Sequence, residues 1–319
     1  LNYGIKMDYY QSEYGQYWED SMFGNELLDT FQPDLIYIHT SWRNIKQFPM
    51  IADTKLDVAN RIDTEYQQFE AMWSSIEKKY HCPIIQNNFD RPNYRLMGNR
   101  DIWDYRGRSH YISELNQKFY CYAQQHDNFY INDLEYIAQD YGLSEWGNSR
   151  YWYMYKYAMC LNAIPYIADS VSKIVKSILG KNKKALSLDL DNTLWGGIVG
   201  DDGIEGIQIG KDTPKGQMYS EFQEYCRNLQ QMGVLLTINS KNEYENALAG
   251  LKHPDGILKE EHFVNIKANW NTKEQNLEET AEELALGIDS FVFVDDNPAE
   301  REIVAAQLPE VAVPQMDRV

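Results

Sequence analysis

The feature that most constrains the fold of this chain is an apolar run that ends in two carboxylates. The run Ala-Leu-Ser-Leu-Asp-Leu-Asp covers residues 185–191, and it places Asp189 and Asp191 two residues apart at its C-terminal end. In an open parallel sheet, ligands bind in the crevice beyond the carboxyl ends of the strands. Two carboxylates in such a crevice can divide the work of nucleophile and general acid or base. The run therefore indicates a catalytic site at a strand end.

The length of the chain predicts two domains. At 319 residues it exceeds the size at which one hydrophobic core usually stops growing. A helical pattern ends near Gly180, a typical residue after a helix, and the solvated segment Lys-Asn-Lys-Lys follows at 181–184. We therefore expect domains at residues 1–180 and 181–319.

Strand and helix patterns alternate along both halves, which predicts two doubly wound α/β domains with parallel sheets. Expected strands in the first half are 34–39, 83–86 and 128–131, and expected helices are 57–79, 109–125, 133–141 and 150–179. Expected strands in the second half are 185–190, 233–238 and 290–294, and expected helices are 214–232, 243–250, 273–286 and 298–306.

The net charge of the chain limits the kinds of partner that it can bind, and its cysteines indicate its cellular compartment. The formal charge of −18 and the isoelectric point near 4.7 argue against binding to nucleic acid or to an anionic membrane, which require clustered Lys and Arg. No apolar run reaches the ~20 residues needed to span a bilayer. The four cysteines show no pairing pattern, so we expect free thiols and a cytoplasmic location. A phosphorylated substrate stays possible if a metal ion and a lysine reverse the local potential.

Four segments in a fixed order carry the chemistry of the second half. Each falls where a strand ends or a helix begins, and each by itself has an ordinary structural explanation such as a turn or a helix cap. They are Asp-Leu-Asp-Asn-Thr at 189–193, Leu-Leu-Thr-Ile-Asn-Ser-Lys-Asn at 235–242, Asn-Trp-Asn-Thr-Lys at 269–273 and Phe-Val-Phe-Val-Asp-Asp-Asn at 291–297. Together they resemble the haloacid dehalogenase (HAD) superfamily of phosphotransferases. The segments at 191–197, 269–273 and 294–302 are similar to its FkbH-like branch, subfamily IIIC.

The resemblance implies a role for each residue of these segments. Asp189 would attack phosphorus to form an aspartyl-phosphate, and Asp191 would protonate the leaving group and later activate water or another acceptor. Thr193 would support the turn, Ser240 would bond a phosphoryl oxygen, and Lys273 would neutralise charge. The ligands of Mg²⁺ would be Asp189, Asp191, Asp295 and Asp296, with Asp296 more direct than Asp295. The substrate would contact Ser240, Lys241, Asn242, Trp195, Gly196 and Gly197.

The spacing of the motifs leaves no room for a large cap domain. A Gly-rich flap from Trp195 to Gly210 and one helix fill the chain between Asp191 and Ser240, and a helix and a connection fill the chain up to Lys273. The flap is equally well explained as a surface hairpin. Because lids commonly exclude water from small substrates, an open site suggests a bulky partner, or a lid supplied by the first half or by another chain.

The first half is compatible with the SGNH-hydrolase-like domain that often precedes the HAD domain in FkbH-like proteins. The resemblance rests on residues 33–40 and 84–89, with Asn87 or Asn88 in the position of an oxyanion-hole residue. The nucleophilic serine would lie before Leu1, so we expect this domain to be N-terminally incomplete. No histidine occurs in residues 133–162, so we expect it to bind or dock rather than to hydrolyse.

These observations lead to two hypotheses of different classes. The first is a Mg²⁺-dependent HAD hydrolase with an aspartyl-phosphate intermediate, acting on a phosphorylated small molecule such as a three-carbon acid. It would be a phosphatase or, by family resemblance, would load a phosphoglycerate-derived unit onto an acyl carrier protein. The second is a non-catalytic scaffold in a biosynthetic cluster that binds a phosphorylated ligand. The presence of both Asp189 and Asp191 favours the enzyme.

Overall fold

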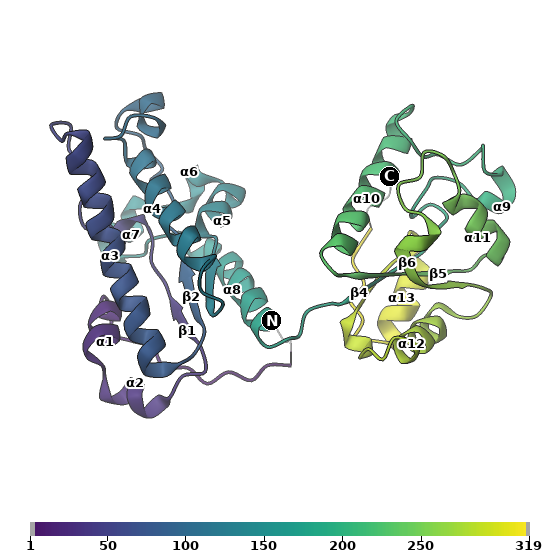
Figure 1. The fold of residues 1–319 in the computed structure, drawn as a ribbon, viewed down its shortest axis with the longest axis horizontal. Coiled ribbons are helices and arrows are strands. Elements are labelled where there is room, and N and C mark those ends of the chain that lie inside the picture. The colour runs from purple at the N-terminus through teal and green to yellow at the C-terminus, as the bar shows by residue number, and fades with distance from the viewer. Residues whose placement is uncertain (1–3, 317–319) are drawn as a thin grey trace. The chain divides into compact units, whose positions relative to one another are not determined.

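The chain divides into two compact units, with the boundary in the sequence between Leu179 and Gly180. A computed structural model describes residues 4–316, and in it each unit is built on its own parallel sheet with helices packed around it (Figure 1). The α/β class with two doubly wound parallel-sheet domains is therefore confirmed. Within the described residues, no helix is both long and apolar enough to cross a membrane.

Unit 1, up to Leu179, contains a three-stranded sheet of order β1-β2-β3. Its strands are β1 (Ile36–Ile38), β2 (Ile84–Asn87) and β3 (Phe129–Asn132). Its α-helices are α1 (Tyr17–Phe23), α2 (Glu26–Phe31), α3 (Lys55–Tyr80), α4 (Arg108–Ala123), α5 (Leu134–Tyr141), α6 (Leu143–Trp146), α7 (Ser149–Tyr155) and α8 (Ile164–Ile178), and its 3₁₀ turns are η1 (Trp42–Asn44), η2 (Gly98–Ile102) and η3 (Leu161–Ala163).

An aromatic core joins α3 and α4 to the sheet of unit 1. Trp73 of α3 is fully buried, and its ring lies 4.8 Å from that of Phe119 on α4 and 4.6 Å from that of Phe129 on β3. A second cluster, which includes Leu134, Trp146 and Ile167, lies beneath α5, α6 and α8. Burial of such large side chains stabilises each by about 1.5–3 kcal/mol, so these clusters hold the strand ends in place.

The single helix expected at 150–179 is wrong, because the segment forms two helices. The first, α7, ends at Lys156, whose φ of 60° places it in the left-handed region. The second, α8, begins with Pro165 in its first turn. Proline lacks a backbone N–H and is tolerated there but not inside a helix, so the chain must restart at this point.

Unit 2, from Gly180, contains a four-stranded parallel sheet of order β6-β5-β4-β7. Its strands are β4 (Ala185–Leu188), β5 (Leu235–Ser240), β6 (Phe263–Ala268) and β7 (Phe291–Val294). Its helices are α9 (Val199–Asp202), α10 (Pro214–Gln231), α11 (Tyr244–Leu251), α12 (Lys273–Glu283) and α13 (Pro298–Gln307), with 3₁₀ turns η4 (Glu260–His262) and η5 (Ile288–Ser290).

Two hydrophobic clusters cover this sheet. One joins Leu188 and Ile238 to Cys226 of α10 and Ala247 of α11, and the other joins Phe293 to helices α12 and α13. The connection from β4 to β5 holds only the short α9, a loop and α10, so the described residues contain no large cap. The paired clusters and short connections leave the carboxyl ends of the strands to form the site.

The sequence pattern predicts only a helix and a connection between Ser240 and Lys273. The structure also contains strand β6 in this segment. It lies at the edge of the sheet and pairs with β5 through a register shift at Leu236 and Thr237. Its sequence Phe-Val-Asn-Ile-Lys-Ala interrupts the apolar pattern with Asn265 and Lys267. An edge strand accepts such polar positions, because one side of it is not covered by a neighbouring strand.

Candidate active site

The centre of the site is a buried lysine held between two aspartates. Lys273 Nζ lies 2.6 Å from Asp189 Oδ1 and 2.8 Å from Asp295 Oδ2, and it donates a third hydrogen bond of 2.8 Å to the backbone oxygen of Asn239. The lysine side chain is 3% exposed. These three acceptors use all three N–H donors of the ammonium group, so its position is fixed.

Neighbouring elements place these groups together. Strands β4 and β7 are paired with Leu188 opposite Val294, so Asp189 and Asp295 emerge at the same edge of the sheet. Lys273 is the first residue of α12. Two buried amides hold that helix end to β5, because Asn239 Nδ2 donates to Lys273 O at 2.8 Å and Asn276 Nδ2 donates to Asn239 Oδ1 at 3.0 Å.

Burial and like charge shift the proton affinities of the site. Burial, together with the nearby charge of Asp295, raises the pKa of Asp189 to about 6 against the opposing effect of Lys273. Burial by itself would lower the pKa of Lys273, but Asp189 and Asp295 outweigh it and raise that pKa. Burial and the charge of Asp295 also raise the pKa of Asp296. The site therefore has an excess of negative charge, which a further cation would relieve.

The residues present fit a divalent cation. Asp189, Asp295 and Asp296 each offer an oxygen, and these oxygens lie within 4.8 Å of one another. Asp296 is exposed, and its carboxylate accepts a hydrogen bond from its own backbone N–H. Three carboxylates and one ammonium group leave two negative charges, which a divalent ion balances. An all-oxygen set of this kind suits Mg²⁺.

Asp191 lies apart from this group of three carboxylates and is held by other contacts. Its Oδ1 accepts hydrogen bonds from Trp195 Nε1 at 2.9 Å and from the backbone N of Val199 at 3.2 Å. Its Oδ2 accepts from Asn242 Nδ2 at 2.8 Å. The structure thus uses Trp195 and Asn242 to orient the second carboxylate of the Asp-x-Asp pair.

The remaining predicted residues occupy different positions around the centre. Ser240 ends β5 and is 2% exposed, and its hydroxyl hydrogen-bonds to Asp189. Thr193 Oγ1 accepts a 3.1 Å hydrogen bond from the backbone N of Asp296 and so ties the turn after β4 to the turn after β7. Lys241 forms a 2.6 Å ion pair with Glu300, so its ammonium group is already engaged.

A cavity of about 950 Å³ opens over these groups. Four lining residues come from one face of α10, a contribution that motif reasoning missed, although their spacing of three and four residues is a typical helix-face signal. The lining residues are Asp189, Asp191, Asn192, Thr193, Ile198, Lys215, Met218, Tyr219, Phe222, Ser240, Lys241, Trp270, Lys273, Asp295, Asp296, Asn297, Pro298, Glu300, Arg301 and Met316.

The flap residues Trp195, Gly196 and Gly197, like Asn242, do not line this cavity. Gly196 exchanges two backbone hydrogen bonds with Gln208, which makes the flap a hairpin. A Cβ on Gly196 would lie 2.8 Å from the ring of Tyr219, so this position requires glycine for close packing. The four residues therefore lie behind the lining, where Trp195 and Asn242 support Asp191.

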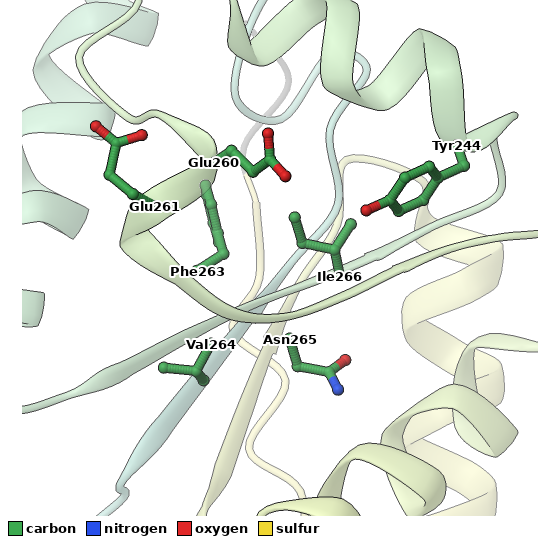
Figure 2. A pocket seen from close by; sticks show the side chains of 7 residues that line it. All are labelled: Tyr244, Glu260, Glu261, Phe263, Val264, Asn265 and Ile266. Atoms are coloured by element: carbon green, nitrogen blue, oxygen red, sulfur yellow. The ribbon is translucent and has the colours of Figure 1, made fainter.

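A second pocket of about 500 Å³ lies at strand β6, away from these carboxylates. Figure 2 shows Tyr244 and Ile266 close together and the two carboxylates of Glu260 and Glu261 beside Phe263. No lysine or arginine lines this pocket. The grouped carboxylates and the buried cation lie instead in the cavity over the carboxyl ends of β4, β5 and β7.

Comparison with known proteins identifies a matching family and a similar crystal structure. Residues 1–176 match the family described as "FkbH, N-terminal domain". The chain is also similar to the crystal structure of the N-terminal part of a Bacteroides fragilis protein that contains a phosphatase domain and is complexed with Mg. The two share 29% sequence identity with a TM-score of 0.87, over 97% of this chain and 81% of that chain. A search of curated proteins found no match.

Proposed function

The chain belongs to the FkbH N-terminal domain family, and on that premise we propose that unit 2 is a Mg²⁺-dependent phosphoryl-transfer enzyme of the HAD type. The observation that carries the proposal is the position of Lys273 Nζ, 2.6 Å from Asp189 and 2.8 Å from Asp295, beside the exposed carboxylate of Asp296. This arrangement offers a nucleophile, a fixed cation and a fitting set of metal ligands. Phosphoryl transfer requires mainly positioning and charge neutralisation, which these groups provide.

The proposed reaction has two steps. In the first, a carboxylate oxygen of Asp189 forms a bond to phosphorus while the bond from phosphorus to the leaving oxygen breaks, and Asp191 donates a proton to that oxygen. In the second, water attacks phosphorus, Asp191 takes a proton from the water, and the bond between Asp189 and phosphorus breaks to release inorganic phosphate. Mg²⁺ bound by Asp189, Asp295 and Asp296 would neutralise charge on the phosphoryl oxygens.

Two further residues suit this reaction. The Ser240 hydroxyl, buried beside Asp189, can donate a hydrogen bond to a phosphoryl oxygen once the substrate is present. Lys273 keeps Asp189 in place and lowers its negative potential, so an anionic phosphate ester can approach it. Both groups act without changing position, which is how preorganised sites stabilise a transition state.

The proposed substrate is a phosphorylated small molecule such as a three-carbon acid. Within the same proposal, water accepts the phosphoryl group in the phosphatase version. In the loading version, the thiol of an acyl carrier protein attacks the carbonyl carbon of a phosphoglycerate-derived acyl phosphate, a thioester bond forms, and the bond from that carbon to the phosphate oxygen breaks to release phosphate. The cavity of about 950 Å³ is roomy for a three-carbon acid, and the described residues place no large cap over it. Both observations support access by a larger acceptor.

For unit 1 we propose an SGNH-hydrolase-like domain that binds rather than hydrolyses. Its parallel sheet carries Asn87 and Asn88 at the end of β2, both fully buried. Asn87 Oδ1 already accepts hydrogen bonds from Tyr37 and Asn132, so that atom is part of an internal network. This arrangement favours a binding role.

The proposed function is tested by phosphate release from a panel of phosphate esters, including phosphorylated three-carbon acids, with and without Mg²⁺. We expect Mg²⁺-dependent release that Asp189→Asn abolishes and that the exposed control Asp127→Asn leaves unchanged. Release that is unaffected by Asp189→Asn would overturn the aspartyl-phosphate mechanism.

A second assay separates the acceptors and the scaffold alternative. The chain is incubated with an acyl phosphate of a phosphorylated three-carbon acid and a phosphopantetheinylated carrier protein, and the mass of the carrier protein is measured by mass spectrometry. A mass increase that requires Asp189 identifies loading, and phosphate release without it identifies a phosphatase. If the wild-type chain binds the ester but gives neither product, the scaffold replaces the enzyme.

A further inference from the structure

A buried polar network in unit 1 ends on an exposed histidine. His39 follows β1, and its Nδ1 lies 2.9 Å from the Tyr37 hydroxyl and 3.0 Å from Asn87 Nδ2. Behind it, Asn132 Nδ2 donates to Asn87 Oδ1 at 2.7 Å, and the Ser170 hydroxyl of α8 donates to Asn132 Oδ1 at 2.7 Å. The network joins the carboxyl ends of all three strands of the unit 1 sheet.

The network fixes which nitrogen of His39 carries the proton. Asn87 Nδ2 also lies 3.2 Å from the backbone oxygen of Thr40, which can only accept a hydrogen bond. The amide of Asn87 must therefore point its NH₂ group toward Thr40 and toward His39 Nδ1. Since an NH₂ group only donates, Nδ1 must accept, and the neutral ring carries its proton on Nε2.

The Nε2–H group is the free end of this network. His39 is exposed, whereas Asn87 and Asn132 are fully buried. Within residues 4–316, Nε2 has no hydrogen-bond partner, and no lysine or arginine hydrogen-bonds to His39, Asn87 or Asn132. Loss of solvation on the protein side lowers the pKa of His39, which favours the neutral ring. The Nε2–H group of His39 is therefore an uncharged hydrogen-bond donor with a fixed orientation.

We propose that the carboxyl edge of the unit 1 sheet is a second binding site, in which His39 Nε2–H donates a hydrogen bond to the carbonyl oxygen of an acyl ligand. The edge is where open α/β sheets bind ligands. A neutral donor suits a carbonyl oxygen better than a phosphate, which requires cations on a chain of net charge −18. Because the proton is on Nε2, this nitrogen cannot accept a proton from a nucleophile at the site. The site therefore binds and polarises the carbonyl group and does not hydrolyse the ligand.

The first test measures the protonation of the ring. Long-range proton–nitrogen NMR spectra of the full ¹⁵N-labelled chain distinguish the two neutral forms, and His39→Gln assigns the signals. His126 serves as an internal reference, because its Nδ1 lies 2.8 Å from the backbone oxygen of Tyr122 and must donate. We expect opposite forms, with the proton on Nε2 in His39 and on Nδ1 in His126. A proton on Nδ1 of His39 would overturn the proposal.

The second test measures binding with defined probes. N-methylacetamide and ethyl acetate supply neutral carbonyl groups, and inorganic phosphate supplies the competing chemistry. We expect saturable shifts of the His39 signals with both carbonyl probes, none at His126, and none with phosphate. Shifts only with phosphate, or no saturable shifts with the carbonyl probes, would overturn the proposal.

Two variants separate a binding role from a structural one. His39→Leu removes the donor and should weaken binding of N-methylacetamide about tenfold, as expected for one lost hydrogen bond. His39→Gln keeps an N–H donor and should retain more of the affinity than the leucine variant. For both, signals from the unit 1 core report folding and resonances near the site report binding. Equal affinity in wild type and both variants would show that His39 only supports the sheet.

Discussion

The indole Nε1 of Trp195 donates a 2.9 Å hydrogen bond to Asp191 Oδ1, four residues earlier in the chain. The same oxygen accepts the backbone N of Val199 at 3.2 Å, so both of its lone pairs are engaged. Among residues 4–316, Oδ2 accepts a hydrogen bond only from Asn242, which leaves one lone pair for a proton. If Asp191 is the acid and base of the proposed reaction, Oδ2 is the atom that carries the proton.

This relationship predicts a substrate-dependent effect of Trp195→Phe. Loss of the indole donor lets the Asp191 carboxylate turn, so proton donation to the leaving oxygen becomes inefficient. We expect kcat/KM for an alkyl phosphate to fall about tenfold or more, since general acid catalysis contributes about 10²–10⁴-fold. With p-nitrophenyl phosphate, whose leaving group needs no proton, the fall should be much smaller. Trp103→Phe, on an exposed side chain of unit 1, is the control, and equal falls with both substrates would contradict the prediction.

Lys273→Met should destabilise the metal-free chain. The substitution leaves Asp189 and Asp295 buried beside each other without their cation. Removal of one partner from a buried ion pair typically lowers the free energy of unfolding by about 3–5 kcal/mol. Urea denaturation at pH 7.5 measures the change, and Lys173→Met, which removes an exposed ion pair with Asp169, should change it by less than about 1 kcal/mol. Similar midpoints for the two variants would count against a structural role of Lys273.

Sequence reasoning succeeded where the pattern is strong and local. The apolar run before Asp189 and the motif around Lys273 fall at the end of β4 and the start of α12, as strand-end motifs should. It missed β6, because Asn265 and Lys267 break the apolar pattern of an edge strand. It also joined α7 to α8, because aromatic residues continue across Lys156 although the backbone there turns left-handed.

The contacts that orient the site were less accessible to sequence reasoning. The lining face of α10 and the support of Asp191 by Trp195 and Asn242 depend on packing between segments far apart in the chain. Motif spacing identifies residues near the chemistry, but it does not distinguish a residue that lines the cavity from one behind it. Trp195, which is 1% exposed, illustrates the difference.

Mg²⁺ binding should depend on pH through Asp189. In the metal-free protein its pKa is raised to about 6, above the ~4 of an unfolded aspartate. Because the pKa is raised, the contribution of this group to stability is fully present below pH ~4 and is lost as pH rises through about 6. Metal binding requires the carboxylate, so Mg²⁺ must displace a proton at pH 5.5 and hardly any at pH 7.5.

Calorimetric titration of Mg²⁺ in two buffers of different ionisation enthalpy counts these protons. We expect proton release at pH 5.5 and weaker binding than at pH 7.5. Asp189→Asn should lower the number of protons released, because it removes one of the two proposed ligands whose pKa is raised. Equal proton counts for wild type at the two pH values would show that Asp189 does not titrate in this range.

Asp295 and Asp296 should respond differently to substitution by asparagine. Asp295 is 1% exposed, accepts from Lys273 at 2.8 Å and from the backbone N of Asn297 at 2.8 Å, so Asp295→Asn disturbs the buried charge pair. Asp296 is exposed, its carboxylate accepts a hydrogen bond from its own backbone N–H, and partial loss of solvation together with the nearby charge of Asp295 raises its pKa. Asp296→Asn should therefore leave the thermal stability of the metal-free chain unchanged or slightly higher, because it removes like-charge repulsion, whereas Asp295→Asn should lower it.

Both variants should weaken Mg²⁺ binding, although they should differ in metal-free stability. If Asp296 is the more direct ligand, Asp296→Asn should weaken Mg²⁺ binding by at least the 10–100-fold typical of lost supporting contacts at metal sites. Calorimetry with Mg²⁺ measures the affinity, and thermal denaturation with a chelator measures metal-free stability. Wild-type affinity in Asp296→Asn would place the ion on Asp189 and Asp295 alone. If Asp296→Asn weakens Mg²⁺ binding and leaves the metal-free stability intact, Asp296 acts as a metal ligand alone, whereas Asp295 also stabilises the fold.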